Sequence, residues 1–414
     1  MSDRARLLYL IGQFPAINHT YIFEEVKILR TLGFDVLIAS VSPPDRPLPE
    51  LSPDEREETA RAYYIKSVPT AEMLLLNLRE FMRHPLGYLR GLVFALRLGG
   101  CGPKQAVYHL AYFAEAVLIG RYMRRLGISH VHANFSATVS LLVTHTFPAT
   151  MSFVAHGYGE LHDPTATHLK ERIRGSSFVR SVSRYGRSQM MLSCDRKDWP
   201  KLIHIPLGIE GARYVPAPPR TNPLCPTVVC VGRLAPEKGQ EILLEAIAIL
   251  RAQGRSLRLR FVGDGPDRAW LESRASELGI ASNVDFVGWV EPERLRDVYA
   301  ETDVCVLSSL AEGVPIVLME AMAMQIACVA PRISGIPELI EHGVDGMLFA
   351  VGDVTELSQQ IGRLLDSPEL RFKVGRAARI RVLGDYDLAT NTKRFARMLA
   401  ERLGTQPPVA SPLN

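Results

Sequence analysis

Two glutamates lie eight positions apart in the segment EGVPIVLME, at Glu312 and Glu320. Glu312 follows an apolar run typical of a strand, and Glu320 falls inside a helix predicted over residues 316–323. The amides that begin such a helix can bind a diphosphate without a metal ion. On this interpretation Glu320 accepts hydrogen bonds from ribose hydroxyls and Glu312 from sugar hydroxyls. The alternative is a helix cap followed by an exposed helix carboxylate.

Two basic side chains lie at an earlier strand end. The β-branched run 227–231 is followed by Gly232, Arg233 and, five residues later, Lys238. Open parallel sheets bind ligands at the carboxyl ends of their strands. Arg233 can hold a diphosphate with two hydrogen bonds, and Lys238 adds a positive charge beside it. Otherwise both are solvated loop residues.

The first half of the chain offers weaker candidates. His156 ends an apolar run and precedes Gly157, which favours an imidazole exposed at a strand end over a structural histidine. Ser183 and Arg184 also follow a predicted strand, and a substrate role and a structural role both remain open for them. The polar residues predicted to be structural are His130, His132 and His145, and those predicted to lie on a helix surface are Glu24 and Glu25.

The elements that position these groups alternate between strand and helix. In the second half, strands are predicted at 227–231, 257–262, 284–287, 304–307 and 327–330, with helices at 240–253, 267–278, 292–300 and 316–323. In the first half, strands are predicted at 7–11, 34–40, 129–132, 152–156 and 178–183, with a helix at 20–32. This alternation predicts an α/β fold of two Rossmann-like, doubly wound parallel-sheet domains facing a central cleft.

The domain boundaries follow from composition. The first domain is predicted over 1–215 with a helical insert at about 70–126, and the second over 216–385 after a proline-rich linker. A terminal helix over 386–403 is expected to pack back on the first domain, and the tail 404–414 to be disordered.

Five motifs carry a family resemblance. VGRLAPEKG, FVGDGP, FVGW, EGVPIVLME and SGIPELIEHGVDGMLF, between residues 225 and 366, resemble the donor-binding domain of the retaining, GT-B enzymes of glycosyltransferase family 4. The first half is similar more weakly, through AHG at 155–157 and SVSRYGRS at 181–188. The family's usual Gly-Gly pair after the first strand is replaced by Gly12 and Gln13, so Gln13 joins Ser183 and Arg184 as a candidate acceptor or cleft residue.

The resemblance implies roles for these residues. Arg233 and Lys238 would bind the donor diphosphate, Glu312 the donor sugar, Glu320 the ribose, and His156 the transferred sugar. The donor-binding backbone would include Gly232, Gly265, Gly313 and Val314. The implied enzyme is a metal-independent, retaining hexosyltransferase (EC 2.4.1.-) with a nucleoside-diphosphate sugar as donor and no cofactor. Its acceptor would be a glycan or lipid-linked glycan, in bacterial cell-surface polysaccharide synthesis. A sugar-nucleotide epimerase and an inert sugar-nucleotide-binding protein are the alternatives.

Composition limits the partners. The six cysteines form no CxxC pair, so we expect reduced thiols and no metal site. No apolar run is long enough to span a bilayer, and no nucleic-acid module is visible, so we expect a cytoplasmic protein without a nucleic-acid partner. Residues 1–215 carry 26 Lys/Arg against 19 Asp/Glu, and arginines alternate with leucines over 74–98. This basic, amphipathic stretch is compatible with an ordinary pair of core helices whose arginines are solvated. The alternative is peripheral contact with an anionic membrane, at the inner face of the cytoplasmic membrane.

Overall fold

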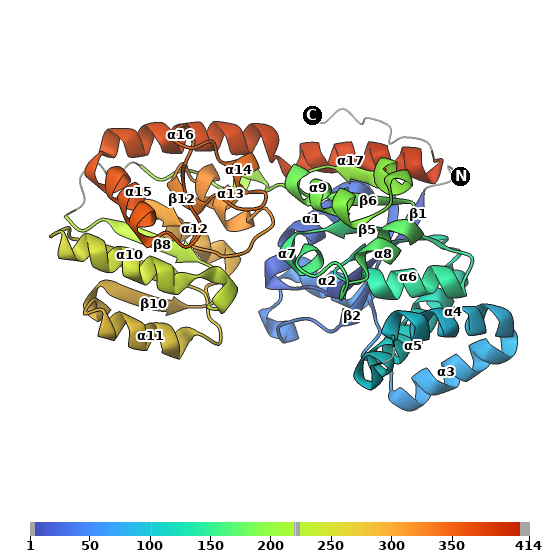
Figure 1. The fold of residues 1–414 in the computed structure, drawn as a ribbon. Helices are drawn as coiled ribbons and strands as arrows, with labels where there is room; N and C mark the ends of the chain where they lie inside the picture. The colour runs from blue at the N-terminus through green and yellow to red at the C-terminus, as the bar shows by residue number, and fades with distance from the viewer. Residues whose placement is uncertain (1–4, 101, 219, 221–223, 406–414) are drawn as a thin grey trace. The chain divides into compact units, whose positions relative to one another are not determined.

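The computed structural model describes residues 5–100, 102–218, 220 and 224–405, and these form two compact units. Unit 1 contains residues 5–182, 186–205 and 392–405, and unit 2 contains 183–185 and 206–391 among the described residues. Each unit holds one parallel sheet (Figure 1). The tail predicted to be disordered lies outside the described residues from 406 onward.

Unit 1 is built on a seven-stranded sheet in the order β3-β2-β1-β4-β5-β6-β7. Its strands are β1 (Arg6–Gln13), β2 (Asp35–Ser42), β3 (Tyr63–Tyr64), β4 (His130–Asn134), β5 (Thr150–Ala155), β6 (Phe178–Ser181) and β7 (Leu202–His204). The chain moves in one direction from β1 to β3 and then returns to β4 on the other side of β1. The loops after β1 and β4 therefore flank a topological switch point, where sheets of this kind bind ligands.

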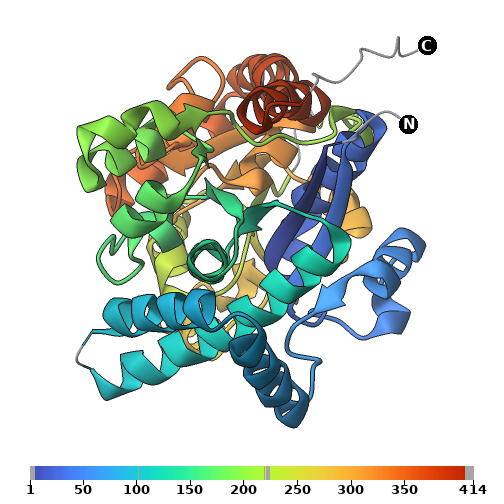
Figure 2. The ribbon, with the colours of Figure 1, turned by 90° about the vertical axis from the view of Figure 1, so that its right-hand side faces the viewer.

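The helices of unit 1 cover both faces of this sheet. They are α1 (Thr20–Thr31), α2 (Pro53–Arg61), α3 (Thr70–Arg83), α4 (Pro85–Gly99), α5 (Pro103–Leu126), α6 (Ala137–Thr146), α7 (Tyr158–Leu161), α8 (Leu169–Gly175), α9 (Arg184–Ser193) and α17 (Leu388–Leu403). Helices α3, α4 and α5 pack against one another at one side of the unit (Figure 2). From Thr392 onward α17 belongs to unit 1.

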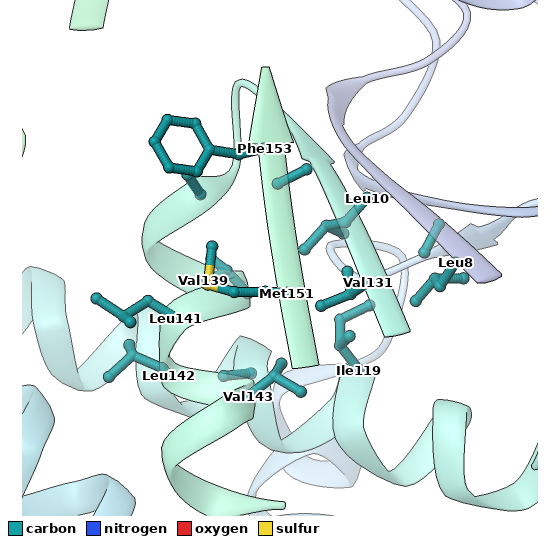
Figure 3. Close-up of a cluster of buried hydrophobic side chains, with 14 of the residues drawn as sticks. Leu8, Leu10, Ile119, Val131, Val139, Leu141, Leu142, Val143, Met151 and Phe153 are labelled. Atoms are coloured by element: carbon teal, nitrogen blue, oxygen red, sulfur yellow. The ribbon is translucent and has the colours of Figure 1, made fainter. Parts of the chain in front are cut away.

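The side chains of β1 contribute to two hydrophobic cores, one on each face of the sheet, because successive residues of a strand point to opposite faces. Leu8 and Leu10 pack with residues of α5 and α6, among them Ile119 and Leu142 (Figure 3). On the other face, the odd-numbered residues of β1 pack with α1 and α17, a cluster that includes Leu7, Tyr9, Ile11, Leu29, Phe395 and Leu399. Each fully buried side chain of this size contributes about 1.5–3 kcal/mol, so both helix layers are fixed to the sheet.

Glu25 corrects one expectation, because it is buried rather than on a helix surface. Only 4% of the residue is exposed, and its carboxylate accepts a 3.0 Å hydrogen bond from the Tyr9 hydroxyl. The same carboxylate pairs with Arg180 on β6, which lies over the ring of Phe395. The apolar face of α1 thus contains a charge whose partner comes from a distant strand, which helical periodicity cannot reveal.

Unit 2 has a six-stranded sheet in the order β10-β9-β8-β11-β12-β13. Its strands are β8 (Thr227–Val231), β9 (Arg258–Val262), β10 (Val284–Gly288), β11 (Val304–Val306), β12 (Ala327–Pro331) and β13 (Met347–Phe349). Its helices are α10 (Gln240–Ala252), α11 (Arg268–Glu277), α12 (Pro292–Ala300), α13 (Ile316–Ala323), α14 (Ile336–Leu339), α15 (Val354–Asp366) and α16 (Pro368–Asp385). The switch point here lies between β8 and β11.

Short 3-10 segments complete the two units. They are Ile17–His19, Leu48–Glu50, Arg196–Lys201, Gly211–Arg213, Pro236–Lys238 and Ala281–Asn283. None of the helices within the described ranges is both long enough and apolar enough to cross a bilayer.

Candidate functional site

Lys238 and Glu312 meet at the switch point of unit 2. Lys238 lies in the loop after β8 and Glu312 in the loop after β11, and their Nζ and Oε1 atoms are 2.6 Å apart. The Ser309 hydroxyl donates to the same oxygen at 2.6 Å. The exposed fractions of the two charged side chains are 24% and 9%, so the pair is largely shielded from water. The structure thus joins two residues that the sequence separates by 74 positions.

Arg233 lies in the same loop but is open to solvent. Its guanidinium pairs with Glu237 at 2.5 Å, and 60% of its side chain is exposed. The nearby guanidinium holds the pKa of the Glu237 carboxyl below its usual value. The loop itself is fixed, because the Gln240 side-chain amide donates to the Arg233 carbonyl at 2.8 Å. Arg233 can therefore exchange Glu237 for another anion without any movement of the backbone.

The start of α13 supplies amide donors beside Glu312. Pro315 precedes the helix in extended conformation, and the first amides to bond back to it are those of Leu318 and Met319. The amides of Ile316 and Val317 therefore have no acceptor within the helix, as at any helix start. The Gly313 carbonyl is engaged by the Gly335 amide at 3.1 Å, which ties this loop to the loop before α14. A helix start held in this way can bind an anionic group.

Glu320, one turn further along α13, is hydrogen-bonded by two tyrosines. The hydroxyl of Tyr214 donates to Oε1 at 2.9 Å, and that of Tyr299 to Oε2 at 3.1 Å. Burial raises the pKa of the Glu320 carboxyl to about 7, and the two hydroxyls act in the opposite direction by stabilising the charged form. The carboxyl can thus change its protonation state near neutral pH.

Close backbone packing shapes the loop after β9. A Cβ atom on Gly265 would lie 2.2 Å from the Leu234 carbonyl oxygen, so only glycine fits there. The Gly232 and Leu234 amides donate to Val262 and Asp264, at 2.9 and 3.0 Å. The loops after β8 and β9 are thereby bonded into one rim at the carboxyl edge of the sheet.

In unit 1, His156 follows β5 and is half-buried. Its Nε2 lies 3.0 Å from the Asn134 side-chain oxygen, and its Nδ1 lies 3.2 Å from the Tyr21 hydroxyl. The amide can only donate from its nitrogen, so Nε2 carries the proton and Nδ1 accepts from Tyr21. Burial lowers the pKa of His156 well below its usual value, with smaller contributions from His19 and Arg180. The imidazole is therefore neutral at physiological pH.

Phe135 links His156 to the switch point of unit 1. Its ring stacks on His156 with a centroid distance of 4.2 Å and on His19 at 4.5 Å. Its backbone has φ of 63°, a left-handed conformation that is costly for a bulky residue, and 44% of the residue is exposed. Two buried polar atoms beside it, Asn134 Nδ2 and Ser136 Oγ, have no hydrogen-bond partner among the described residues. Strain and unpaired polar atoms of this kind concentrate at functional sites.

The remaining candidates, Gln13, Ser183 and Arg184, lie in segments that hydrogen bonds hold in place. The Gln13 side-chain amide donates to the Pro43 carbonyl at 3.1 Å. Ser183 and Arg184 are grouped with unit 2, where Glu338 accepts hydrogen bonds from the amides of Arg184 and Tyr185 at 2.8 and 2.7 Å. Glu338 thus holds the backbone of residues 184 and 185 within unit 2, a contact that the sequence alone did not reveal.

Sequence reasoning missed the residues that support the predicted ones. They are Tyr21, Asn134 and Phe135 around His156, and Tyr214, Tyr299 and Ser309 around the two glutamates. Phe135 directly follows a strand, and the position after a strand end is the one available signal. The described part of the chain contains no group of three or more His, Cys, Asp or Glu side chains placed to hold a metal ion.

Known proteins resemble this chain in sequence and in fold. A family model described as "Glycosyl transferases group 1" matches residues 225–367. The chain is 30% identical over 305 residues to the GDP-mannose-dependent alpha-(1-6)-phosphatidylinositol monomannoside mannosyltransferase of Mycolicibacterium smegmatis, covering 70% of this chain and 75% of that protein. It is 24% identical over 422 residues to the putative colanic acid biosynthesis glycosyltransferase WcaL of Escherichia coli, covering 94% and 98%.

Among solved structures, HepE of Anabaena in complex with UDP superposes with a TM-score of 0.71 at 18% identity, covering 96% of this chain and all of that one. At this identity the likeness shows the fold, and it agrees with the two Rossmann-like sheets described above. The predicted fold class of two Rossmann-like, parallel-sheet α/β domains is confirmed.

Proposed function

The chain belongs to the group 1 glycosyltransferases and has their GT-B fold, and from this premise we propose which reaction it performs and with which residues. The proposed reaction moves a hexose-type sugar from a nucleoside-diphosphate sugar to a glycan or lipid-linked acceptor, with retention at the anomeric carbon. It needs no metal ion and no cofactor. It is proposed to serve bacterial cell-surface polysaccharide or glycolipid synthesis, as the names of the mannosyltransferase and of WcaL suggest for those proteins.

The observation that carries the proposal is the Lys238–Glu312 pair at the start of α13. A cation, a carboxylate and helix-start amides converge there at the switch point of a parallel sheet. This set suits a donor whose diphosphate is anionic and whose sugar presents hydroxyl donors. Lys238, Arg233 and the amides near Gly313 and Val314 would bind the diphosphate, and Glu312 would accept from sugar hydroxyls.

The reaction would proceed mainly by stabilisation of the leaving group. As the bond from the anomeric carbon to the phosphate oxygen breaks, negative charge grows on the diphosphate, where Arg233 and Lys238 lie. The sugar passes through an oxocarbenium-like state, and the acceptor hydroxyl attacks on the face that the diphosphate leaves. The departing phosphate oxygen would take the acceptor proton, so that no separate base is required.

His156 would contact the transferred sugar. Its Nε2 proton, now donated to the Asn134 oxygen, would be donated instead to a sugar hydroxyl oxygen, and the Asn134 side-chain oxygen and its unpaired Nδ2 would both be free to bond to the sugar. A neutral imidazole suits this role better than a cation, which the nascent oxocarbenium would repel. The lowered pKa of His156 supports that state.

Glu320 would bind the ribose, with Tyr214 and Tyr299 keeping its carboxyl in place. The rim formed by the loops after β8 and β9, which includes Gly232 and Gly265, would lie against the nucleoside. Gln13, Ser183 and Arg184 are proposed for the acceptor side. With a lipid-linked acceptor, the enzyme would act at the inner face of the cytoplasmic membrane and would bind that membrane peripherally.

The experiment that tests this proposal is a donor panel with chelator present. Uridine, guanosine and adenosine diphosphate sugars are incubated with wild type and with Glu312→Ala. NMR then follows the hydrolysis of the donor and the anomeric configuration of the product formed with a simple acceptor. We expect one donor class to be turned over with retention, and turnover to be lost in the variant.

The matched control is Glu277→Ala, which removes an exposed glutamate on α11 that pairs with Arg274. Its turnover should equal that of wild type. Loss in both variants, or turnover of no donor by a folded protein, would contradict the assignment of the donor site.

A further inference from the structure

The helices α3, α4 and α5 expose an unusual share of the apolar side chains. Of the 25 exposed large hydrophobic residues among those described, 12 lie between positions 74 and 112. They are Leu74, Leu75, Leu78, Met82, Leu86, Leu89, Val93, Leu96, Val107, Tyr108, Leu110 and Tyr112. Monomeric proteins rarely expose large apolar patches, and such patches mark surfaces that bind a partner.

On α4 these side chains form one continuous stripe. At 100° per residue, Leu86, Leu89, Val93 and Leu96 fall within an arc of about 80°. Leu86 is 84% exposed, so the stripe faces solvent rather than the core. Both exposed arginines of the helix, Arg90 and Arg97, directly flank one edge of the stripe.

On α3 the pattern repeats. Leu74, Leu75, Leu78 and Met82 share an arc of about 100°, and Arg79 and Arg83 project beside it. Across residues 70–112 the sequence has five Lys/Arg against two Glu, and one of these, Glu80, is buried against Arg121 and Arg124. An apolar stripe edged by cations is the pattern of a surface that lies on anionic lipid.

Beside this surface is a cavity of about 570 Å³ between α3, α5 and β3, with four arginines among its lining residues. Glu80 neutralises Arg121 and Arg124, at 2.9 and 2.7 Å. Within the described ranges no carboxylate pairs with the other two, Arg83 and Arg125. Glu72 also lines the cavity, but within the described ranges it forms no salt bridge with either arginine. The lining therefore keeps an excess of positive charge, which suits a ligand with a negatively charged phosphate.

The cavity wall is rigid as well as basic. The rings of Tyr63 and Tyr122 stack with centroids 4.5 Å apart and planes 8° apart. The Arg125 guanidinium lies over the Tyr122 ring at 5.5 Å, which limits its rotamers. Arg83 approaches from the end of α3, next to the apolar stripe of that helix. The basic residues of the cavity thus come from α3 and α5, helices that also carry exposed apolar side chains.

We propose that the exposed face of α3–α5 docks on the surface of an anionic bilayer and that the cavity holding Arg83 and Arg125 binds the phosphate of an anionic phospholipid. The apolar stripes enter the outer part of the acyl region, and the flanking arginines lie at the level of the headgroups. The inference deepens the membrane contact proposed above but does not depend on the transfer reaction, so donor turnover and lipid binding can fail separately.

Flotation with vesicles tests the proposal on the full chain. Vesicles of pure phosphatidylcholine are compared with vesicles containing one third phosphatidylglycerol, for wild type, Arg83→Gln/Arg125→Gln and Leu86→Gln/Val93→Gln. None of the four substituted side chains has a buried ion-pair partner, and a variant whose thermal unfolding midpoint matches that of wild type is folded. The charge-matched control is Lys373→Gln/Arg376→Gln, which removes two exposed cations of α16.

Wild type should bind the anionic vesicles and not the neutral ones. An arginine near an anionic surface strengthens binding about fivefold, so the double arginine variant should bind about thirtyfold more weakly. Each lost apolar side chain should cost about tenfold, and the α16 control should bind like wild type. Inorganic phosphate at constant ionic strength should not displace the vesicles.

Three results would overturn the proposal. Equal binding to neutral and anionic vesicles, or binding to neither, would exclude an anionic bilayer as the partner. If the Arg83/Arg125 variant bound anionic vesicles as tightly as wild type, the cavity would have no part in membrane binding. Displacement of vesicles by millimolar inorganic phosphate would identify the cavity as a site for free phosphate instead.

Discussion

The affinity for the sugar-nucleotide donor should fall as the pH falls through 7, because Glu320 must be ionised to accept hydrogen bonds from the ribose. Burial raises the pKa of this carboxyl to about 7, while the hydroxyls of Tyr214 and Tyr299 favour its charged form. The donor itself keeps one negative charge on each phosphate throughout this range. A change in affinity therefore reports the protein rather than the ligand.

The magnitude follows from the fraction of ionised carboxyl. With a pKa of 7, this fraction is about nine-tenths at pH 8 and about one-tenth at pH 6, which weakens donor binding about tenfold. Removing the Tyr299 hydroxyl takes away a hydrogen bond to the charged form, so Tyr299→Phe should move the midpoint upward by about one pH unit. Glu320→Gln cannot titrate and should bind weakly and evenly at every pH.

Calorimetric titration of the donor between pH 5.5 and 8.5, at constant ionic strength, measures these affinities. The heat of binding in two buffers of different ionisation enthalpy gives the protons released. A profile that stays pH-dependent in Glu320→Gln would assign the titration to another group. A midpoint that moves downward in Tyr299→Phe would refute the role given to the tyrosines.

Three further predictions follow from individual contacts. Lys238→Met should lower kcat about a hundredfold or more, because it removes the positive charge that stabilises the departing diphosphate. Steady-state rates measure this effect, and Lys373→Met on the exposed face of α16 should match wild type. Gly265→Ala places a Cβ atom 2.2 Å from the Leu234 carbonyl oxygen and should lower the free energy of unfolding by about 1–3 kcal/mol in calorimetry, whereas Gly384→Ala, with open space around it, should not. Glu25→Gln removes the charge that pairs with the buried Arg180 and should destabilise unit 1 by about 3–5 kcal/mol. The exposed Arg61–Glu57 pair is its control, since Glu57→Gln should cost under about 1 kcal/mol in the same denaturant titration. Equal losses in both members of either stability comparison would contradict the packing argument.

Much of the fold could be predicted because its elements obey simple periodicities. The strand over 227–231 and the helices over 292–300 and 316–323 have the predicted bounds. Three strands were missed, β3, β7 and β13, since two or three residues are too few to display alternation. β11 is as short, but it lies in the apolar run over 304–307 that predicted it. The predicted strand over 178–183 ends at Ser181, because the next residues leave the sheet for the start of α9.

The candidate site was predictable only in part. Lys238 and Glu312 could be named because each follows a strand at the same edge of one sheet, and the structure places them 2.6 Å apart. Tyr214 and Tyr299 could not be assigned to Glu320, since contacts over 106 and 21 positions depend on packing rather than spacing. Phe135 was missed because its left-handed backbone conformation leaves no mark in the sequence.

The most direct test of the donor site is calorimetric titration of UDP, GDP and ADP with chelator present, on wild type and on Arg233→Gln/Lys238→Gln. We expect one nucleoside diphosphate to bind without metal, and the double variant to bind it at least about a hundredfold more weakly. Equal affinity in wild type and variant, or binding to the folded protein only after metal is restored, would contradict this expectation.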